Sequence, residues 1–229
     1  MAPSEHGDLP VLVGAGVTLR ELRPADAATL FSLLTADQVV KFISPPPSSP
    51  DGFEKFIRWS IAERKQGRHF SFGIVPDGLT DPVGVFQIRI LDRGSNVAEW
   101  GFVLAYSFWG TGIFPEAARL ILEFVFDTLG VHRLEARAAV PNGRGHGALR
   151  KVSAVHEINL RESFYRNGIW FDQVFVVDYG TRVARTGACA ARGGQAQRAR
   201  GTRARGNEPR CPSRLAIGLA RSPCRTLRG

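Results

Sequence analysis

Two glycines separated by one residue are the feature of this sequence best suited to hold a ligand. Gly110 and Gly112 stand between a strand-like run and a long apolar run that opens at Pro115. Glycines at this spacing let the backbone turn tightly, and the free N–H groups of the helix that follows favour a phosphate or pyrophosphate. The segment has no Walker lysine, and Pro115 stands where a dinucleotide fingerprint needs its third glycine. By itself, Gly-x-Gly predicts a plain structural turn as readily as a phosphate site.

Other polar residues have ordinary interpretations when each is taken alone. Glu99 lies on the strand before the glycine turn, on the face opposite Trp100, and could be a solvated strand carboxylate. Asn142 follows Pro141 and suits a turn equally well. The histidines show no metal-ligand spacing and the serines lack the Gly-x-Ser-x-Gly elbow, so we expect neither a metal site nor a serine nucleophile.

The elements that must position these residues follow from the spacing of apolar side chains. The alternating runs predict strands over 17–23, 69–75, 82–91, 96–104, 133–140, 156–164 and 170–179. The helical spacings predict helices over 24–35, 51–66, 115–129 and 143–155. The turns between consecutive strands indicate antiparallel pairing, with Asn167-Gly168 closing the last hairpin. The sequence therefore predicts an α/β (α+β) domain with a mixed, mostly antiparallel sheet flanked by helices.

Charge divides the chain into two parts. Residues 1–180 carry 18 Lys and Arg against 20 Asp and Glu, whereas residues 181–229 carry 12 Arg against the single acid Glu208. All three cysteines lie in the second part, and no aromatic residue follows Tyr179. We expect one globular domain over 1–180 and a disordered Arg/Gly/Ala-rich tail over 181–229, because the tail has too few apolar residues to offset its ordering entropy. A natural extension and a shifted reading frame both explain this tail.

Several classes of protein do not fit the chain. No run approaches the roughly 18 apolar residues of a membrane helix, and the first residues have neither the basic nor the apolar region of a secretory signal. We therefore expect a cytoplasmic protein with no membrane contact. The basic tail predicts at most non-specific affinity for nucleic acid.

Three segments together resemble the GNAT superfamily of acetyl-CoA-dependent N-acetyltransferases. They are the run from Glu99 to Ala117 through Trp-Gly-Thr-Gly-Ile-Phe-Pro-Glu, the run from Leu129 to Arg137, and the pair Pro141-Asn142. The ending over 160–174 is similar to the final hairpin of the Rim-type subgroup, whose members acetylate protein N-termini or small amines. The resemblance covers about residues 17–180 and implies the GNAT acyltransferase fold.

The resemblance also implies roles for particular residues. The turn Trp109, Gly110, Thr111, Gly112, Ile113 and Phe114 would bind acetyl-CoA as co-substrate, with its backbone N–H groups on the pyrophosphate. Glu99 would be the general base, and Asn142 would face the pantetheine or the reacting thioester. A primary amine, on a protein N-terminus or a small molecule, would attack the thioester directly in a ternary complex. No metal is implied, and a monomer and a homodimer are both compatible with the sequence.

Some positions depart from the pattern of the family. Phe114 stands where relatives have Gly or Ala, and Leu149 stands where many have a general-acid tyrosine. These departures motivate a rival hypothesis, a non-catalytic acyl-CoA-binding module. A third hypothesis is a nucleic-acid-binding protein that acts through its basic tail.

Overall fold

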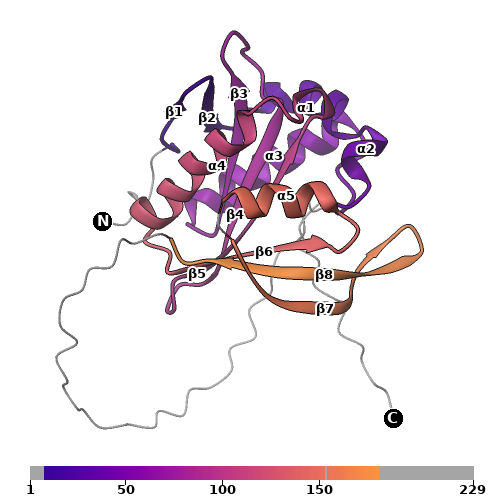
Figure 1. The fold of residues 1–229 in the computed structure, drawn as a ribbon. Coiled ribbons are helices and arrows are strands. Elements are labelled where there is room, and N and C mark those ends of the chain that lie inside the picture. The colour runs from indigo at the N-terminus through magenta and orange to yellow at the C-terminus, as the bar shows by residue number, and fades with distance from the viewer. Residues whose placement is uncertain (1–7, 153, 181–229) are drawn as a thin grey trace, which may run out of the picture.

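A single sheet of eight strands organises the molecule. The computed structural model describes residues 8–152 and 154–180, and its strands follow the order β1-β2-β3-β4-β5-β6-β8-β7 (Figure 1). The strands are β1 (Leu12–Gly14), β2 (Val17–Glu21), β3 (His69–Pro76), β4 (Gly84–Asp92), β5 (Val97–Leu104), β6 (Arg133–Ala139), β7 (Val155–Arg166) and β8 (Ile169–Asp178). Every neighbouring pair is antiparallel except β5 and β6, which are parallel. The predicted mixed, mostly antiparallel sheet is confirmed.

Five α-helices accompany this sheet in the described part of the chain. They are α1 (Ala27–Leu34), α2 (Asp37–Val40), α3 (Pro50–Lys65), α4 (Ile113–Glu123) and α5 (Gly143–Lys151). A π-helical turn over Phe124–Thr128 prolongs α4. The expected helix over 115–129 therefore begins two residues earlier and ends in a different geometry. The short β1 and α2 were not predicted, because three or four residues are too few to show a periodicity.

Helices α3 and α4 cover opposite faces of the sheet. Trp59 of α3 contacts His69, with 4.9 Å between ring centroids, and Phe124 contacts Phe72 at 5.0 Å. His69 and Phe72 point to opposite faces of β3 because strand side chains alternate. In Figure 1, α4 and α5 lie on the same side of the sheet.

The two faces of the sheet differ in chemistry. The α4 face is aromatic, with Phe86 stacked on Trp100 at 5.8 Å. Buried polar residues gather on the α3 face instead: His69, Ser71, Gln87 and Glu99 are each at most 3 % exposed. The register of β3, β4 and β5 puts these four side chains on one side. Glu99 is thus part of a buried polar layer under the sheet, not a solvated strand residue.

The predicted tail over 181–229 lies outside the described residues, so its expected disorder stays a prediction. Within the described ranges, no helix is long and apolar enough to cross a membrane.

Candidate active site

A cleft opens where the two parallel strands separate. β5 and β6 pair only over Val97–Glu99 and Arg133–Glu135. Beyond these positions β5 continues to pair with β4, and β6 pairs with β8. Within the described ranges, the facing edges of the two strands therefore have no strand partner from Trp100 and Ala136 onward. Backbone N–H and C=O groups at such edges remain available to a ligand that carries amides of its own.

The cleft has an apolar lining that contains one charged side chain among the described residues. The lining residues are Phe42, Ile43, Trp100, Gly101, Phe102, Ala136, Arg137, Ala138, Asn142, Gly145 and Leu149. Phe42 and Ile43 come from the segment after α2, where no sequence motif indicates a site. Phe42 also contacts Phe171 of β8 at 6.3 Å, so this segment reaches across toward the last hairpin.

The glycine turn leads directly into α4, as a phosphate-binding turn requires. Gly110 has φ +81° and Gly112 has φ +91°, values that favour glycine, and a Cβ at either position would meet no atom within 4 Å. Gly112 is the N-cap residue of α4, and no side chain caps this end of the helix. The first N–H groups of α4 thus have no side-chain cap among the described residues, and the helix dipole adds positive potential there.

Other side chains fix the shape of this turn. Trp109 donates its indole N–H to the carbonyl of Leu104 at 2.8 Å, and Thr111 donates its hydroxyl to the carbonyl of Phe108 at 2.8 Å. The guanidinium of Arg144, from the first turn of α5, lies 4.8 Å from the Trp109 ring. This cation–π contact links α5 to the turn.

Phe114, the bulky departure from the family pattern, packs into the protein. Its ring lies 4.5 Å from the ring of Phe102 and 5.9 Å from that of Phe86. Ile113 beside it also packs against the core. The aromatic face of the sheet therefore accommodates the ring of Phe114.

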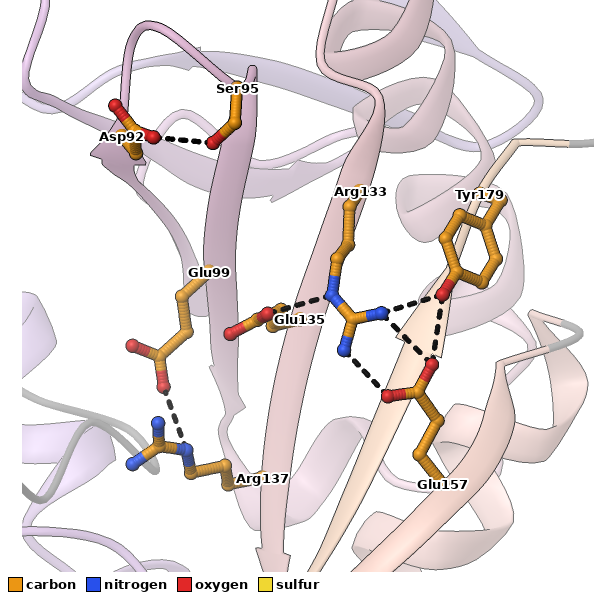
Figure 2. A network of polar contacts seen from close by, with 8 residues as sticks. All are labelled: Asp92, Ser95, Glu99, Arg133, Glu135, Arg137, Glu157 and Tyr179. Carbon is orange, nitrogen blue, oxygen red and sulfur yellow. Dashed lines mark hydrogen bonds and ion pairs between the residues drawn. The ribbon is translucent and has the colours of Figure 1, made fainter. Parts of the chain in front are cut away.

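Glu99 is buried between two arginines. Its side chain is 1 % exposed, with Oε2 accepting a hydrogen bond from Nη2 of Arg89 at 2.7 Å. Oε1 lies 3.7 Å from Nε of Arg137 and accepts no hydrogen bond within the described residues (Figure 2). Burial raises the pKa of Glu99, while Arg137 and Arg89 oppose this rise.

Glu99 lies at the point where β5 and β6 begin to separate. It occupies the last paired position of β5, opposite Glu135. Glu99 does not line the cleft itself, but its ion-pair partner Arg137 does. The structure thus places the predicted carboxylate behind one arginine, on the face opposite the aromatic side chains. Arg89 and Arg137 could not be predicted as its partners, since only the strand register reveals them.

Asn142 lines the cleft and also caps a helix. Its Oδ1 accepts a hydrogen bond from the backbone N–H of Gly145 at 2.9 Å, at the start of α5. A side-chain amide whose oxygen is engaged still has two N–H donors to offer. Leu149, further along α5, is 3 % exposed and lines the same cleft.

The predicted site residues fall into two groups. The turn from Trp109 to Phe114 adjoins the α4 face, and Asn142 lines the cleft from the same side. Glu99 lies on the α3 face. Among the described residues, no group of three or more His, Cys, Asp or Glu side chains gathers in a way that could hold a metal ion.

Comparison with known proteins identifies relatives in sequence and in fold. A family model described as an acetyltransferase (GNAT) domain matches residues 17–154, which is more than half of the chain. YdaF of Bacillus subtilis, whose name assigns it as a ribosomal N-acetyltransferase, is 28% identical over 172 residues. That match covers 71% of this chain and 91% of YdaF.

Solved structures share the fold. Mycobacterium smegmatis RimJ in complex with CoA-disulfide superposes with a TM-score of 0.68 at 24% identity, covering 76% of this chain and 88% of RimJ. The ribosomal-protein-S5-alanine acetyltransferase of Vibrio fischeri gives a TM-score of 0.68 at 18% identity, covering 76% of this chain and 98% of that protein.

Proposed function

The chain belongs to the GNAT family of acetyltransferases, which take their acetyl group from acetyl-CoA, and from this premise we propose that it acetylates a primary amine by direct attack in a ternary complex. The observation that carries the proposal is the pairing of β5 with β6, which stops at Glu99 and Glu135. The cleft beyond these positions has unpaired strand edges, a buried carboxylate lies at the last paired position, and the glycine turn with the start of α4 follows the end of β5.

The turn from Trp109 to Phe114 suits the pyrophosphate of acetyl-CoA. A Cβ added to Gly110 or Gly112 would meet no atom within 4 Å, and α4 begins there with no side-chain cap. Backbone N–H groups at an uncapped helix start lack partners within the helix, so an anion satisfies them. The ring of Phe114 packs against Phe102 and Phe86, so it no longer counts as a reason to prefer the rival hypothesis of a non-catalytic acyl-CoA-binding module.

The separated strands suit the pantetheine arm and the thioester. Pantetheine contains two amides, and the unpaired backbone edges of β5 and β6 can exchange hydrogen bonds with them as a neighbouring strand would. Holding the thioester in this way makes the attack by a bound amine effectively unimolecular.

Glu99 supplies the base in this proposal. A primary amine is mostly protonated at neutral pH and must lose a proton before its lone pair can attack. Because Arg137 stands between Glu99 and the cleft, the proton passes to Oε1 through a water molecule. The attack forms a C–N bond and a tetrahedral oxyanion, which the N–H donors of Asn142 and of the nearby backbone stabilise.

The C–S bond then breaks and CoA leaves as a thiolate. Of the described residues that line the cleft, none is Tyr, Cys, His or Lys, and Leu149 fills the place of the missing tyrosine. A thiol with a pKa near 8.5 leaves readily without an enzymatic acid. As the intermediate collapses, its nitrogen, which still carries two hydrogens, releases one proton to water and becomes the amide nitrogen. The thiolate takes its proton from water in this mechanism.

Two kinds of acceptor follow from the names of the relatives. One relative is named for ribosomal N-acetylation, and another, 22% identical, is a spermidine N(1)-acetyltransferase of Vibrio cholerae. The acceptors to test are therefore protein N-termini and small amines.

The decisive experiment mixes the full chain with acetyl-CoA and a panel of N-terminal peptides and small amines. Thiol release must accompany the gain of one acetyl group on an acceptor, seen by mass spectrometry. Binding of acetyl-CoA with no acetylated product from any acceptor would support the non-catalytic module instead. Activity on nucleic-acid-bound acceptors alone would favour a role through the basic tail.

A further inference from the structure

A buried glutamine next to Glu99 has an amide nitrogen that donates no hydrogen bond to the described part of the chain. Resting on the proposed function, we propose that Gln87 is a positioning residue whose amide binds the water molecule that carries the proton of the amine to Glu99. This role follows from the register of β4 and β5 and from the buried polar atoms that gather where β5 and β6 separate. No sequence motif indicates Gln87, because its place beside Glu99 depends on strand pairing.

The amide nitrogen of Gln87 is buried without a partner. Gln87 is 2 % exposed, and its Nε2 has no hydrogen-bond partner within the described residues. A buried polar atom in this state normally binds water or a ligand, because leaving it unpaired costs free energy. Oε1 of Glu99 is a second such atom, and it is an acceptor where Nε2 is a donor. A single water molecule can satisfy both, since it accepts from Nε2 and donates to Oε1.

The strand register places Gln87 next to Glu99 on the side of the cleft. Arg89 pairs with Glu99 across β4 and β5, and Gln87 pairs with Gly101. Gln87 and Glu99 are therefore diagonal neighbours on one face, a relation that separates positions by about 7–8 Å and lets long side chains meet. Gly101 lies two residues beyond the last position at which β5 pairs with β6, and it lines the cleft. As a glycine it has no side chain to set opposite Gln87.

Arg89 and Gln87 act on different atoms. Nη2 of Arg89 donates to Oε2 of Glu99 at 2.7 Å and so fixes the orientation of the carboxylate. Oε1 is left as the oxygen that accepts the proton. The amide of Gln87 orients the water toward Oε1 without adding a positive charge, which would repel an incoming ammonium group. The second lone pair of the water accepts a hydrogen bond from that ammonium.

The relay moves one proton in two transfers. An N–H bond of the ammonium breaks as its proton passes to the water, and the water releases another of its protons to Oε1. The water is thereby restored, the amine gains the lone pair that attacks the thioester, and Glu99 becomes protonated. A base that acts through one water needs that water within hydrogen-bond distance of both groups. Gln87 supplies a third contact that holds it there.

The test combines a change at Gln87 with a change at Glu99. Gln87→Met keeps the length of the side chain and removes the N–H donors. The full chain is assayed with acetyl-CoA and the best acceptor from the panel of peptides and amines. We expect kcat/KM at neutral pH to fall at least tenfold, while acetyl-CoA affinity by calorimetry stays unchanged. In a chain that already carries Glu99→Gln, the same change should alter kcat/KM by about twofold or less, because the water then has no carboxylate to serve.

A pH profile distinguishes loss of the relay from damage to the fold. The deficit of Gln87→Met should shrink as the pH rises, because an amine that is already unprotonated needs no relay. The charged groups that act on Glu99 are unchanged in this variant: Arg137, Arg89 and Glu135. His69, opposite Arg89 on β3, has a pKa lowered to about 4 by burial, so its ring stays neutral across the profile. Damage to the fold would lower the rate at every pH.

Gln173→Met is the matched control. Gln173 of β8 is 1 % exposed, and its Oε1 accepts a hydrogen bond from the hydroxyl of Ser163 at 3.1 Å. The same substitution of an equally buried glutamine should keep kcat/KM within about threefold, even if it lowers the melting temperature as much as Gln87→Met does. Gln87→Leu removes the same donors with a smaller side chain, and decides the question if Gln87→Met does not fold.

Two failures are distinguishable. The role of Gln87 is overturned, while the acetyltransferase stands, if Gln87→Met keeps kcat/KM within about threefold, loses the same fraction at every pH, or lowers the rate of the Glu99→Gln chain as much as that of the unmodified one. Acetyl-CoA binding with no acetylation of any acceptor by the unmodified chain would overturn the proposed function, and the role of Gln87 with it.

Discussion

Burial gives Glu99 properties that an exposed strand carboxylate would lack. The side chain is 1 % exposed, one oxygen is held by Arg89, and the other accepts no hydrogen bond within the described residues. A base needs an oxygen with an available lone pair and a pKa close to the working pH. Burial shifts the pKa of Glu99 upward toward that range, and Arg137 and Arg89 limit the shift.

Glu99→Gln should lower kcat/KM about 10²–10⁴-fold at neutral pH, because Gln keeps the shape but cannot accept the proton. In the unmodified enzyme kcat/KM should fall as the pH drops through the raised pKa of Glu99, where the carboxylate becomes protonated. This acid limb should disappear in the variant, which should recover at high pH as free amine accumulates. Steady-state rates across pH, with acetyl-CoA affinity by calorimetry, test both points.

Glu135→Gln is the matched control for this change. Glu135 faces the same side of the sheet and pairs directly with Glu99 across the strands, but its carboxylate bonds Arg133. Its variant should keep the rate within about threefold. A Glu99→Gln enzyme that is equally active would assign proton removal to another group or to bulk water.

His69 connects the buried polar layer to the pH dependence of stability. Its Nε2 lies 3.1 Å from the hydroxyl of Ser71, and burial, with Arg89 nearby, lowers its pKa from 6.5 to about 4. In the unfolded chain the His69 ring becomes protonated as the pH falls through about 6.5, whereas in the folded chain it stays neutral until about pH 4. His69 therefore makes its full contribution to the free energy of unfolding above pH 6.5, and this contribution is lost as the pH falls toward 4. The loss is on the order of 3 kcal/mol.

His69→Gln should flatten the fall in stability between pH 6.5 and pH 4, even if it lowers stability at pH 7. Urea unfolding at several pH values measures this slope. His156→Gln changes an exposed histidine of β7 and serves as the control. If the His69 variant loses stability with acid as steeply as the unmodified chain does, His69 is not the residue responsible.

At the scale of elements, a substitution at the junction between the glycine turn and α4 tests whether this turn binds acetyl-CoA. Gly112→Val should weaken acetyl-CoA binding at least tenfold, about 1.4 kcal/mol, because its methyl groups would fill the open space before α4. The positive φ of this residue also costs a non-glycine residue about 1–3 kcal/mol of stability. A control variant must therefore distinguish affinity lost through backbone strain from affinity lost because the side chain blocks the ligand.

Gly130→Val separates the two effects. Gly130 follows the π-helical turn at the other end of α4, has φ +68°, and a Cβ added there would likewise meet no atom within 4 Å. The variant should lose similar stability in thermal melts while its acetyl-CoA affinity by calorimetry stays unchanged. Equal affinities for the two variants would remove the glycine turn from the binding site.

Most elements could be predicted from the sequence, but few of the contacts between them. The strands with alternating side chains and the final hairpin at Asn167-Gly168 were recognisable because the signals for them are local. The point at which β5 leaves β6 depends on a crossover and a register that no local pattern encodes. The same holds for Arg137 beside Glu99, 38 residues apart in sequence, and for Phe42 and Ile43 in the cleft. Long-range register therefore determines the parts of the site that remained unpredicted.

At the scale of the whole molecule, the part of the chain that the structure describes ends at Gly180, where the strongly basic sequence begins. The sheet ends with β8 at Asp178, whose Oδ1 accepts a hydrogen bond from the N–H of Gly180 at 2.8 Å. A Cβ added to Gly180 would lie 3.0 Å from the ring of Phe126, so this ring lies close to the end of the described chain. Residues 181–229 contribute 12 Arg against one acid. We propose that stability and acetyl-CoA binding belong to residues 1–180, and affinity for polyanions to the remainder.

A chain that ends at Gly180 should melt cooperatively and bind acetyl-CoA with unchanged affinity, because the sheet, the glycine turn and the cleft are all retained. It should also lose retention on a heparin column, since 18 basic residues against 20 acidic ones leave it slightly negative. A full-length variant with six tail arginines changed to Gln provides the control, because it should lose retention while keeping the length of the chain. If truncation abolishes the cooperative melt, residues beyond Gly180 belong to the fold, and if heparin retention survives truncation, the polyanion site lies on the acetyltransferase domain itself.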